Sequence, residues 1–167
     1  PAAGFNGEKD EIYIPFFFIS ISYSQFLETG DTLPSNLGLP WCSNGPAFTD
    51  SLFFDDYNGS INSRGQYSVI WIMMFTSWCP YCDAEVWYTQ PFYEEYQDSG
   101  LVVIGMGWDW GEPYNCEEWS DAYGLTYPLI DDTEDSDDGG TLFDLFSDGG
   151  VPHNVILNHN MEVIYSL

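Results

Sequence analysis

Two apolar runs of strand length, with one helix between them, are the sequence feature that most restricts how this chain can fold. Residues 68–75 (SVIWIMMF) and 101–107 (LVVIGMG) consist almost entirely of hydrophobic side chains, as strands do when both faces of their sheet are covered. Residues 79–98 form the helix candidate between them, and Gly100 follows where glycine commonly ends a helix. Strands that alternate with helices in this way are typical of an α/β fold.

Capping and turn residues predict the remaining elements of the second part of the chain. These are a short helix begun by Asn115 and Glu118 and ended by Gly124, a second short helix at 142–146 begun by Thr141 and Asp144, and a terminal hairpin of residues 154–157 and 161–165. Together with the two buried runs, these elements predict a central mixed β-sheet flanked by helices.

Residues 1–45 differ in pattern from residues 46–167. We treat them as two regions, an N-terminal extended segment with a loop and an α/β domain. Residues 12–19 are apolar at both alternating sets of positions, so an extended segment there would be apolar on both faces. Residues 29–46 are rich in Gly, Pro and Asn, which predicts a loop.

Residues 47–54 predict a strand that leads into a hairpin turn. The turn is indicated by Asn58-Gly59, the dipeptide most typical of two-residue hairpin connections. Asn58-Gly59-Ser60 also matches the acceptor pattern for N-glycosylation, and one segment can serve both roles.

The charge of the chain excludes two classes of function. Asp and Glu number 27 against two basic residues, Lys9 and Arg64, for a formal net charge of −25. Such a surface repels phosphate backbones and anionic lipid headgroups, so binding of nucleic acids or membranes through basic patches is excluded. The sequence contains no apolar run of about 18 residues, the length that a membrane-spanning helix needs.

Several weak signals favour a location outside the cytoplasm. Lys is depleted and Asp is abundant, which suits a salt-rich or extracellular setting, and the cysteine count of four is even. The numbering starts at Pro1 without a basic leader. We therefore expect an extracytoplasmic protein, whether periplasmic, at the cell surface or secreted.

An acidic run at residues 131–138 places six carboxylates among eight residues. Like charges at this density repel one another, so the run is either a solvated loop or a site for a cation such as calcium. The spacing of an EF-hand loop is absent. The calcium candidates are Asp131, Asp132, Glu134, Asp135 and Asp137, and the sequence predicts no other cofactor.

The residues with chemical potential gather in Trp78-Cys79-Pro80-Tyr81-Cys82, where a buried strand leads into a helix. A cysteine in the first turn of a helix has its thiolate stabilised by unpaired backbone N–H groups and the positive end of the helix dipole. Cys82 lies three residues on, on the same helical face, and can form a disulfide with Cys79. Half of a zinc site is the alternative, but a second Cys/His pair at ligand spacing is missing. A redox-active disulfide is therefore the preferred interpretation.

These residues resemble the thioredoxin-fold superfamily, and within it the TlpA/ResA-like extracytoplasmic thiol–disulfide oxidoreductases. The resemblance extends over residues 46–167 and rests on the run 75–82 (FTSWCPYC), on Glu85 three positions after the second cysteine, and on Gly150-Val151-Pro152. It implies a thioredoxin-like fold in which the Val151–Pro152 peptide bond is cis and faces the disulfide.

The resemblance also implies roles for the site residues. Cys79, as the thiolate, attacks a disulfide of a protein substrate, and Cys82 resolves the mixed disulfide. Trp78 shields the sulfurs and contacts substrate, and Pro152 is the cis-proline that faces the disulfide. Glu85 is either a proton acceptor, as in the family, or a solvated helix carboxylate. The other substrate-contact candidates are Val151 through its backbone, Pro80, Tyr81, and His153, which is either a proton shuttle or a polar strand residue at the rim of the sheet.

Protein thiols and disulfides are the expected partners. Pro80-Tyr81 is the dipeptide of glutaredoxins, but those proteins hold glutathione partly through basic residues, and only Lys9 and Arg64 are present here. Glutathione is therefore not the expected substrate.

A non-catalytic structural or assembly subunit is the alternative function. The family usually has a helix after the terminal hairpin, whereas this chain stops at Leu167. We expect the apolar N-terminal segment to cover the exposed sheet face, in cis or from a neighbouring subunit. A strand that pairs with another chain leads to homo-oligomers or filaments, and carboxylates near the cysteines disfavour a thiolate.

Cys42 and Cys116 lie outside the motif. The leading interpretation is a structural disulfide between them, which would stabilise the fold by about 4 kcal/mol because it closes a long loop. A second redox relay with Cys79 and Cys82, or two free and buried thiols, are the alternatives.

Overall fold

A computed structural model describes residues 26–47, 49–133, 142–147 and 150–167. Its strands are β1 (Gly38–Ser43), β2 (Ser51–Phe53), β3 (Val69–Thr76), β4 (Leu101–Asp109), β5 (Leu129–Asp131), β6 (His153–Leu157) and β7 (Val163–Ser166). Its helices are α1 (Pro80–Tyr96), α2 (Cys116–Tyr123) and α3 (Phe143–Phe146), with two 3-10 turns, η1 (Phe54–Tyr57) and η2 (Gln97–Ser99).

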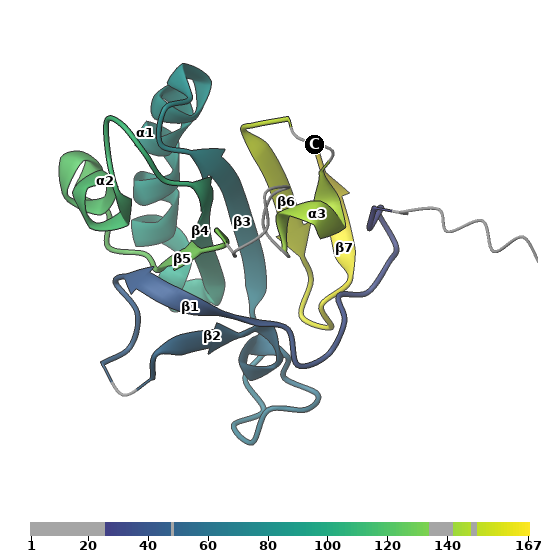
Figure 1. Cartoon of the computed structure of the whole chain (residues 1–167). Helices are drawn as coiled ribbons and strands as arrows, with labels where there is room; N and C mark the ends of the chain where they lie inside the picture. The colour runs from purple at the N-terminus through teal and green to yellow at the C-terminus, as the bar shows by residue number, and fades with distance from the viewer. Residues whose placement is uncertain (1–25, 48, 134–141, 148–149) are drawn as a thin grey trace, which may run out of the picture.

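The strands form one mixed sheet in the order β2-β1-β5-β4-β3-β6-β7 (Figure 1). The three central strands β5, β4 and β3 are parallel, and every other pairing is antiparallel. The two predicted apolar runs are β3 and β4, side by side at the centre. The predicted α/β fold, with a mixed sheet flanked by helices and closed by a terminal hairpin, is confirmed.

The sheet separates two hydrophobic cores because successive side chains of a strand point to opposite faces. One face packs against α1 and α2, and the other against α3 and η1, as Figure 1 shows for the helices. The first core contains Met73, Phe75, Val103, Trp119 and Leu129. The second contains Ile72, Met74, Ile104, Met106 and Phe143. Burial on both faces explains why β3 and β4 lack the polar alternation of a solvated sheet.

The predicted helix ends agree closely with the structure. α1 begins after Cys79, and Gly100 ends the following 3-10 turn with φ 95°. For α2, the Asn115 side chain accepts from the amide of Glu118, and the Glu118 side chain accepts from the amide of Asn115. Gly124 ends α2 with φ 61°. The capping signature is therefore confirmed.

The loop predicted at residues 29–46 is wrong in part, because it contains strand β1. Glycine suggested a loop in this segment, but Gly38 has a different role in the structure. A Cβ atom at Gly38 would lie 2.5 Å from the Phe53 ring, so the glycine lets β1 and β2 pack closely. Pairing with β5 on one side and β2 on the other outweighs local composition.

The hairpin predicted at Asn58-Gly59 is also wrong. Strand β2 lies within the predicted 47–54 segment, but it is followed by η1, whose Phe54 is buried in the second core. The Asn58 side chain instead accepts hydrogen bonds from the amide and hydroxyl of Ser60, an Asx turn that needs no second strand.

The N-terminal part of the described chain lies along β7. The amide of Gly30 donates to the carbonyl of Val163, and the amide of Val163 donates to the carbonyl of Asp31. The apolar segment at 12–19 lies outside the described residues, and so does Thr141, the predicted start of the short helix. α3 begins instead where the Asp132 carboxylate accepts from the amides of Leu142 and Phe143.

Candidate active site

The two cysteines of the motif lie where β3 leads into α1, as the sequence predicts. Cys79 is the N-cap of α1, Pro80 is the first helical residue, and both cysteines are free thiols buried in the protein. The amide of Cys82 donates to the Cys79 sulfur at 3.2 Å. The sulfur therefore lies at the end of the helix where unpaired amides and the helix dipole favour negative charge.

The segment before Pro152 faces Cys79 across 72 positions of sequence. The Val151–Pro152 peptide bond is cis, as the resemblance implies. The Cys79 thiol lies 3.8 Å from the Val151 carbonyl oxygen. The two motifs of the resemblance therefore meet at one sulfur atom.

Cys82 differs from Cys79 in its burial. Its side chain has no solvent exposure. The pKa of the Cys82 thiol is raised, first by burial, then by its hydrogen bond with Cys79 and by the charge of Glu85. Cys82 therefore stays protonated at neutral pH, which suits a second, resolving thiol and not the attacking one.

Glu85 is not a solvated helix carboxylate, because it is half-buried and points into a hydrogen-bonded chain. Its Oε1 accepts from the Asn154 side chain at 2.7 Å, and the Asn154 Oδ1 accepts from the Trp71 indole at 2.7 Å. The other oxygen, Oε2, is buried and has no hydrogen-bond partner within the described structure. Sequence analysis missed Asn154 and Trp71. The only signal was a tryptophan in a buried strand, whose indole N–H needs a partner.

The remaining predicted residues surround the thiols with unequal exposure. Trp78 is 53% exposed, and its indole donates to the Asp109 carboxylate at 2.8 Å. Tyr81 is 76% exposed, and Pro80 beside it is exposed too. His153 is a half-buried residue of β6 whose Nε2 lies 2.9 Å from the Ser166 hydroxyl. This contact fits the polar strand interpretation, and a role in proton transfer stays a prediction.

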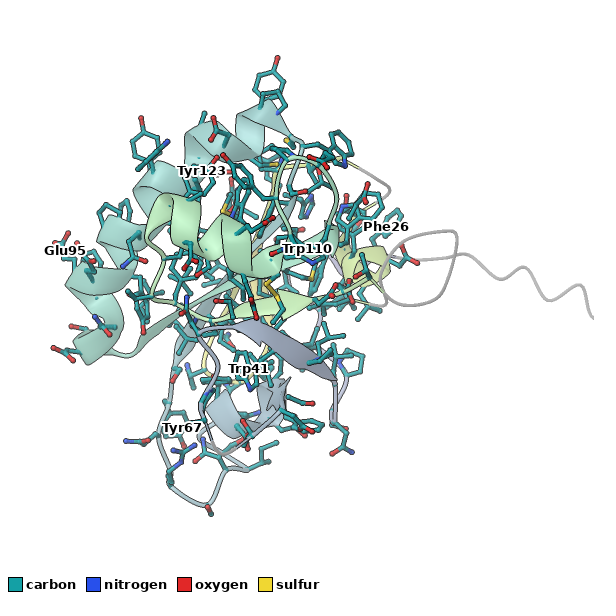
Figure 2. All side chains as sticks on the ribbon, turned by 60° about the vertical axis from the view of Figure 1, so that its left-hand side comes forward. Phe26, Trp41, Tyr67, Glu95, Trp110 and Tyr123 are labelled. Carbon is teal, nitrogen blue, oxygen red and sulfur yellow. A yellow bond between two sulfur atoms is a disulfide. The ribbon has the colours of Figure 1, made fainter. Side chains whose placement is uncertain are left out.

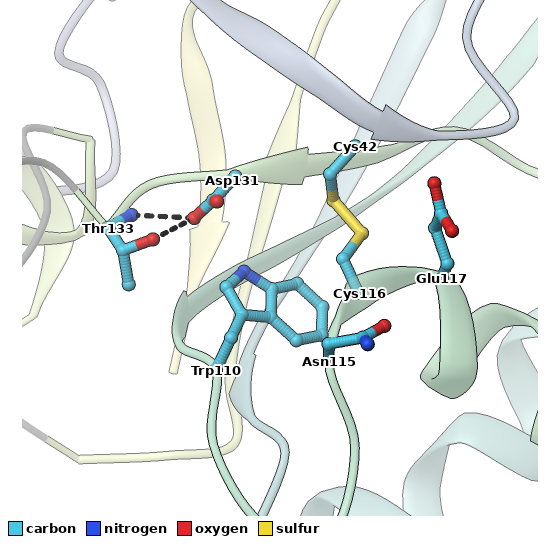
Figure 3. A pocket seen from close by; sticks show the side chains of 7 residues that line it. All are labelled: Cys42, Trp110, Asn115, Cys116, Glu117, Asp131 and Thr133. Carbon is cyan, nitrogen blue, oxygen red and sulfur yellow. Dashed lines mark hydrogen bonds between the residues drawn. A yellow bond between two sulfur atoms is a disulfide. The ribbon is translucent and has the colours of Figure 1, made fainter.

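The disulfide between Cys42 and Cys116 is confirmed, and its purely structural role stays a prediction. It joins β1 to the first residue of α2, with 6.0 Å between the two Cα atoms. Figure 2 shows it beside Trp110, and Figure 3 shows it at the wall of a pocket of about 310 Å³. A cis peptide bond at Glu112–Pro113, which the sequence did not predict, lies in the segment that leads to α2.

The acidic run lies only partly within the described structure. Asp131 accepts from the amide of Thr133, and Asp132 is buried against the start of α3. The other three candidates, Glu134, Asp135 and Asp137, lie outside the described residues. Among the described residues there is no group of three or more His, Cys, Asp or Glu side chains arranged to hold a metal. Calcium binding stays a prediction.

The fold and the site define a class of protein. A Cys-x-x-Cys pair that starts a helix after a parallel strand, with a cis-proline segment against the first sulfur, is the arrangement of thioredoxin-fold proteins. Residues 53–166 match the AhpC/TSA family, and the chain belongs to that family.

Curated relatives carry one name. The thiol-disulfide oxidoreductase ResA of Oceanobacillus iheyensis is 28% identical over 94 residues, which are 56% of this chain and 46% of that protein. ResA of Geobacillus thermodenitrificans is 27% identical over 109 residues, 65% of this chain and 54% of that protein. The chain thus spans about half the length of the curated relatives it matches.

Solved structures share the fold. The thioredoxin domain of a thiol-disulfide oxidoreductase from Bacteroides vulgatus superposes with a TM-score of 0.63 at 16% identity, over 84% of this chain and 88% of that chain. A secreted disulfide oxidoreductase of Mycobacterium tuberculosis superposes with a TM-score of 0.59 at 13% identity, over 79% of this chain and 82% of that chain.

None of the helices in the described part of the chain is both long and apolar enough to cross a membrane.

Proposed function

We propose that this chain is a thiol–disulfide oxidoreductase that exchanges the Cys79–Cys82 pair with protein disulfides. The observation that carries the proposal is the position of the Cys79 sulfur. It accepts from the amide of Cys82 at the start of α1 and lies against the carbonyl of Val151. The sulfur thus lies at the start of a helix on one side, and on the other side it faces backbone groups that can hold an extended substrate.

The chemistry proceeds in two steps that move two electrons to the substrate. The Cys79 thiolate attacks one sulfur of a substrate disulfide, forms a mixed disulfide and releases the first substrate thiolate. The Cys82 thiol then loses its proton and attacks the Cys79 sulfur, which forms the Cys79–Cys82 disulfide and releases the second substrate thiolate. Each released thiolate takes up a proton, and the reverse sequence oxidises a substrate dithiol.

Glu85 is the proton acceptor for Cys82 in this proposal. Cys82 has a raised pKa and no exposure to solvent, so its proton needs an acceptor inside the protein. The Oε2 atom of Glu85 is buried and has no hydrogen-bond partner within the described structure, while Oε1 is held by Asn154. One oxygen thus fixes the carboxylate and the other is left to receive a proton.

Protein substrates and an extracytoplasmic location complete the proposal. The charge of −25 disfavours small anionic thiols such as glutathione. The ResA relatives are thiol-disulfide oxidoreductases by name, and the Mycobacterium tuberculosis structure is that of a secreted enzyme. These likenesses support an oxidoreductase that works where disulfides form.

A redox titration tests the proposal. The protein is equilibrated in thiol–disulfide buffers of known potential, its free thiols are alkylated, and mass spectrometry assigns each cysteine. We expect Cys79–Cys82 to equilibrate between about −100 and −280 mV, while Cys42–Cys116 stays oxidised. If the Cys79–Cys82 disulfide is reduced only at potentials below about −300 mV, it is a structural disulfide and the oxidoreductase proposal is wrong.

A homo-oligomer formed through the N-terminal segment stays a prediction. Residues 12–19, which carry that prediction, lie outside the described structure, and nothing in the site depends on a second chain. Light scattering of the full chain and of a chain that begins at residue 26 tests it. The same number of subunits in the two proteins would contradict assembly through this segment.

A further inference from the structure

A pocket of about 250 Å³ opens beside Cys79 on the side of α2. It is lined by Ser77, Trp78, Cys79, Pro80, Asp83, Pro113, Tyr114 and Tyr123. Its three aromatic side chains come from three segments that are distant in sequence, namely the turn before α1, the connection from β4 to α2, and the last residue of α2. The segment Val151–Pro152 is not in this lining, so the pocket is separate from the backbone contact on the other side of the sulfur.

The walls of this pocket are held in place by hydrogen bonds around it. The Trp78 indole donates to Asp109 at 2.8 Å, and the amide of Gly111 donates to the Ser77 hydroxyl at 3.1 Å. The disulfide at Cys116 fixes the start of α2 to β1. A pocket whose walls are already fixed loses little conformational entropy when a ligand enters it.

One carboxylate is held at the rim of the aromatic walls. Tyr123 lies where α2 meets α1 (Figure 2), and its hydroxyl donates to the Asp83 carboxylate. The rings of Tyr114 and Tyr123 stand at 75°, with centroids 6.2 Å apart. Burial and the bond to Asp83 raise the pKa of Tyr123, so the hydroxyl stays a donor at neutral pH. No Lys or Arg is among the residues that line the pocket.

We propose that this pocket binds a lysine or arginine side chain next to the cysteine of a protein substrate, an inference that rests on the proposed exchange at Cys79. Aromatic faces attract a cation through their quadrupoles, and the fixed carboxylate of Asp83 adds a full charge. A neutral side chain would gain only the contact with the rings. An acidic one would be repelled by Asp83 and by the net charge of −25.

Exchange kinetics with two matched peptides test the preference. Each peptide is a symmetrical disulfide dimer. Lysine flanks the cysteine in the first peptide, and glutamine flanks it in the second. The reduced protein reacts with each peptide in a single turnover. Rates are divided by those with dithiothreitol, which removes the intrinsic difference between the two disulfides. We expect the lysine peptide to react about fivefold faster, from the size of a cation–π contact together with an ion pair.

Variants separate the pocket from the general charge of the protein. Asp83→Asn and Tyr123→Phe should each lower the fivefold preference to about twofold. Asp98→Asn removes one charge in η2, beyond the far end of α1 and outside the pocket, and should leave the preference unchanged. Equal rates for the two peptides, or an equal loss of preference in Asp98→Asn and Asp83→Asn, would overturn the proposal.

A binding measurement keeps this proposal distinct from the proposed function. Peptides with serine in place of cysteine are titrated into the protein, and the indole N–H signal of Trp78 is followed by NMR. If neither disulfide peptide reacts, the oxidoreductase proposal fails, and the pocket is judged by binding alone. Tighter binding of the lysine peptide than of the glutamine peptide supports the pocket, and equal affinity overturns it.

Discussion

The chain has two cysteine pairs, and in each pair one cysteine begins a helix that follows a parallel strand. Cys79 is the N-cap of α1 after β3, and Cys116 is the first residue of α2 after β4. The pairs differ in the position of the partner. Cys82 lies three residues away in the same helix, whereas Cys42 lies 74 residues away in β1.

The position of the partner, and not access, separates the two pairs. Pockets of about 250 and 310 Å³ adjoin Cys79 and the Cys42–Cys116 disulfide, so both can be approached from solvent. A disulfide between Cys79 and Cys82 would close only a single helical turn, so its formation and reduction leave the rest of the fold in place. The Cys42–Cys116 disulfide joins β1 to α2 and closes a long loop in the unfolded chain. Its reduction gives the unfolded chain more freedom, which lowers the free energy of unfolding by several kcal/mol. The same kind of helix start can therefore serve exchange in one place and stability in another.

The largest expected effect is the loss of exchange in Cys79→Ser. A hydroxyl at this position is not ionised at neutral pH and cannot attack a disulfide, so reduction of a peptide disulfide should fall to background. The melting temperature should stay within a few degrees, because serine keeps the shape of the N-cap. The matched control is Cys82→Ser, which keeps the first attack and should accumulate a mixed disulfide at Cys79. Residual turnover in Cys79→Ser would contradict the assignment.

The double variant Cys42→Ala/Cys116→Ala should show the opposite pattern. Loss of a disulfide across 74 residues should lower the free energy of unfolding by about 4 kcal/mol, measured by urea denaturation. Exchange at 25 °C should remain within about twofold, because the Cys79 sulfur is hydrogen-bonded to the amide of Cys82 and the carbonyl of Val151, and the variant changes neither residue. A folded double variant that no longer exchanges would instead indicate a relay between the two pairs.

Local signals were enough to predict the central part of the fold. In β3, α1, β4 and α2, apolar runs, capping residues and terminal glycines all indicate the same elements. The resemblance to a known family supplied the contact between Cys79 and the Val151–Pro152 segment, which no local pattern contains. Strand β1 was missed because Gly38 counted as a loop residue, although its lack of a side chain is what lets two strands pack closely.

The missed parts of the site depend on sheet register and on helix packing. Glu85 reaches Asn154 because β6 pairs with β3 so that Met73 lies opposite Asn154. A shift of one residue would turn Asn154 to the other face. Asp83 and Tyr123 meet because α2 packs beside α1, across 40 residues. Neither register nor helix packing is encoded in one short segment, so these contacts appear only in the structure.

Asn154→Ala tests whether the hydrogen bond that holds Glu85 contributes to exchange at Cys79 and Cys82. The variant removes a partly buried hydrogen bond to a carboxylate, so the free energy of unfolding should fall by about 2 kcal/mol. The second step of exchange should also slow, because Glu85 is no longer fixed near Cys82. Asn160→Ala, an exposed asparagine in the turn between β6 and β7, is the control and should cost less than about 0.5 kcal/mol. A destabilised Asn154→Ala that resolves mixed disulfides at the normal rate would show that Asn154 has only a structural role.

The smallest expected effect is an alkaline loss of stability caused by Cys82. Its pKa is raised in the folded protein, so above its ordinary value of 9.0 the unfolded chain releases a proton that the folded protein keeps. Because the unfolded state then binds fewer protons, stability falls as the pH rises. Between pH 9 and 10 the reduced wild type should lose about 1 kcal/mol through this group.

Cys82→Ser isolates this loss, because every other titrating group is the same in the two proteins. Tyr57, Tyr123 and Tyr127 also have raised pKa values, but their ordinary value is 10.0, so most of their contribution comes above pH 10 and is shared. The free energy of unfolding, measured in urea under reducing conditions, should therefore decline more steeply from pH 9 to 10 in the wild type than in Cys82→Ser. Equal slopes would mean that Cys82 ionises in the folded protein as easily as in the unfolded chain. The proposed need for Glu85 as its proton acceptor would then disappear.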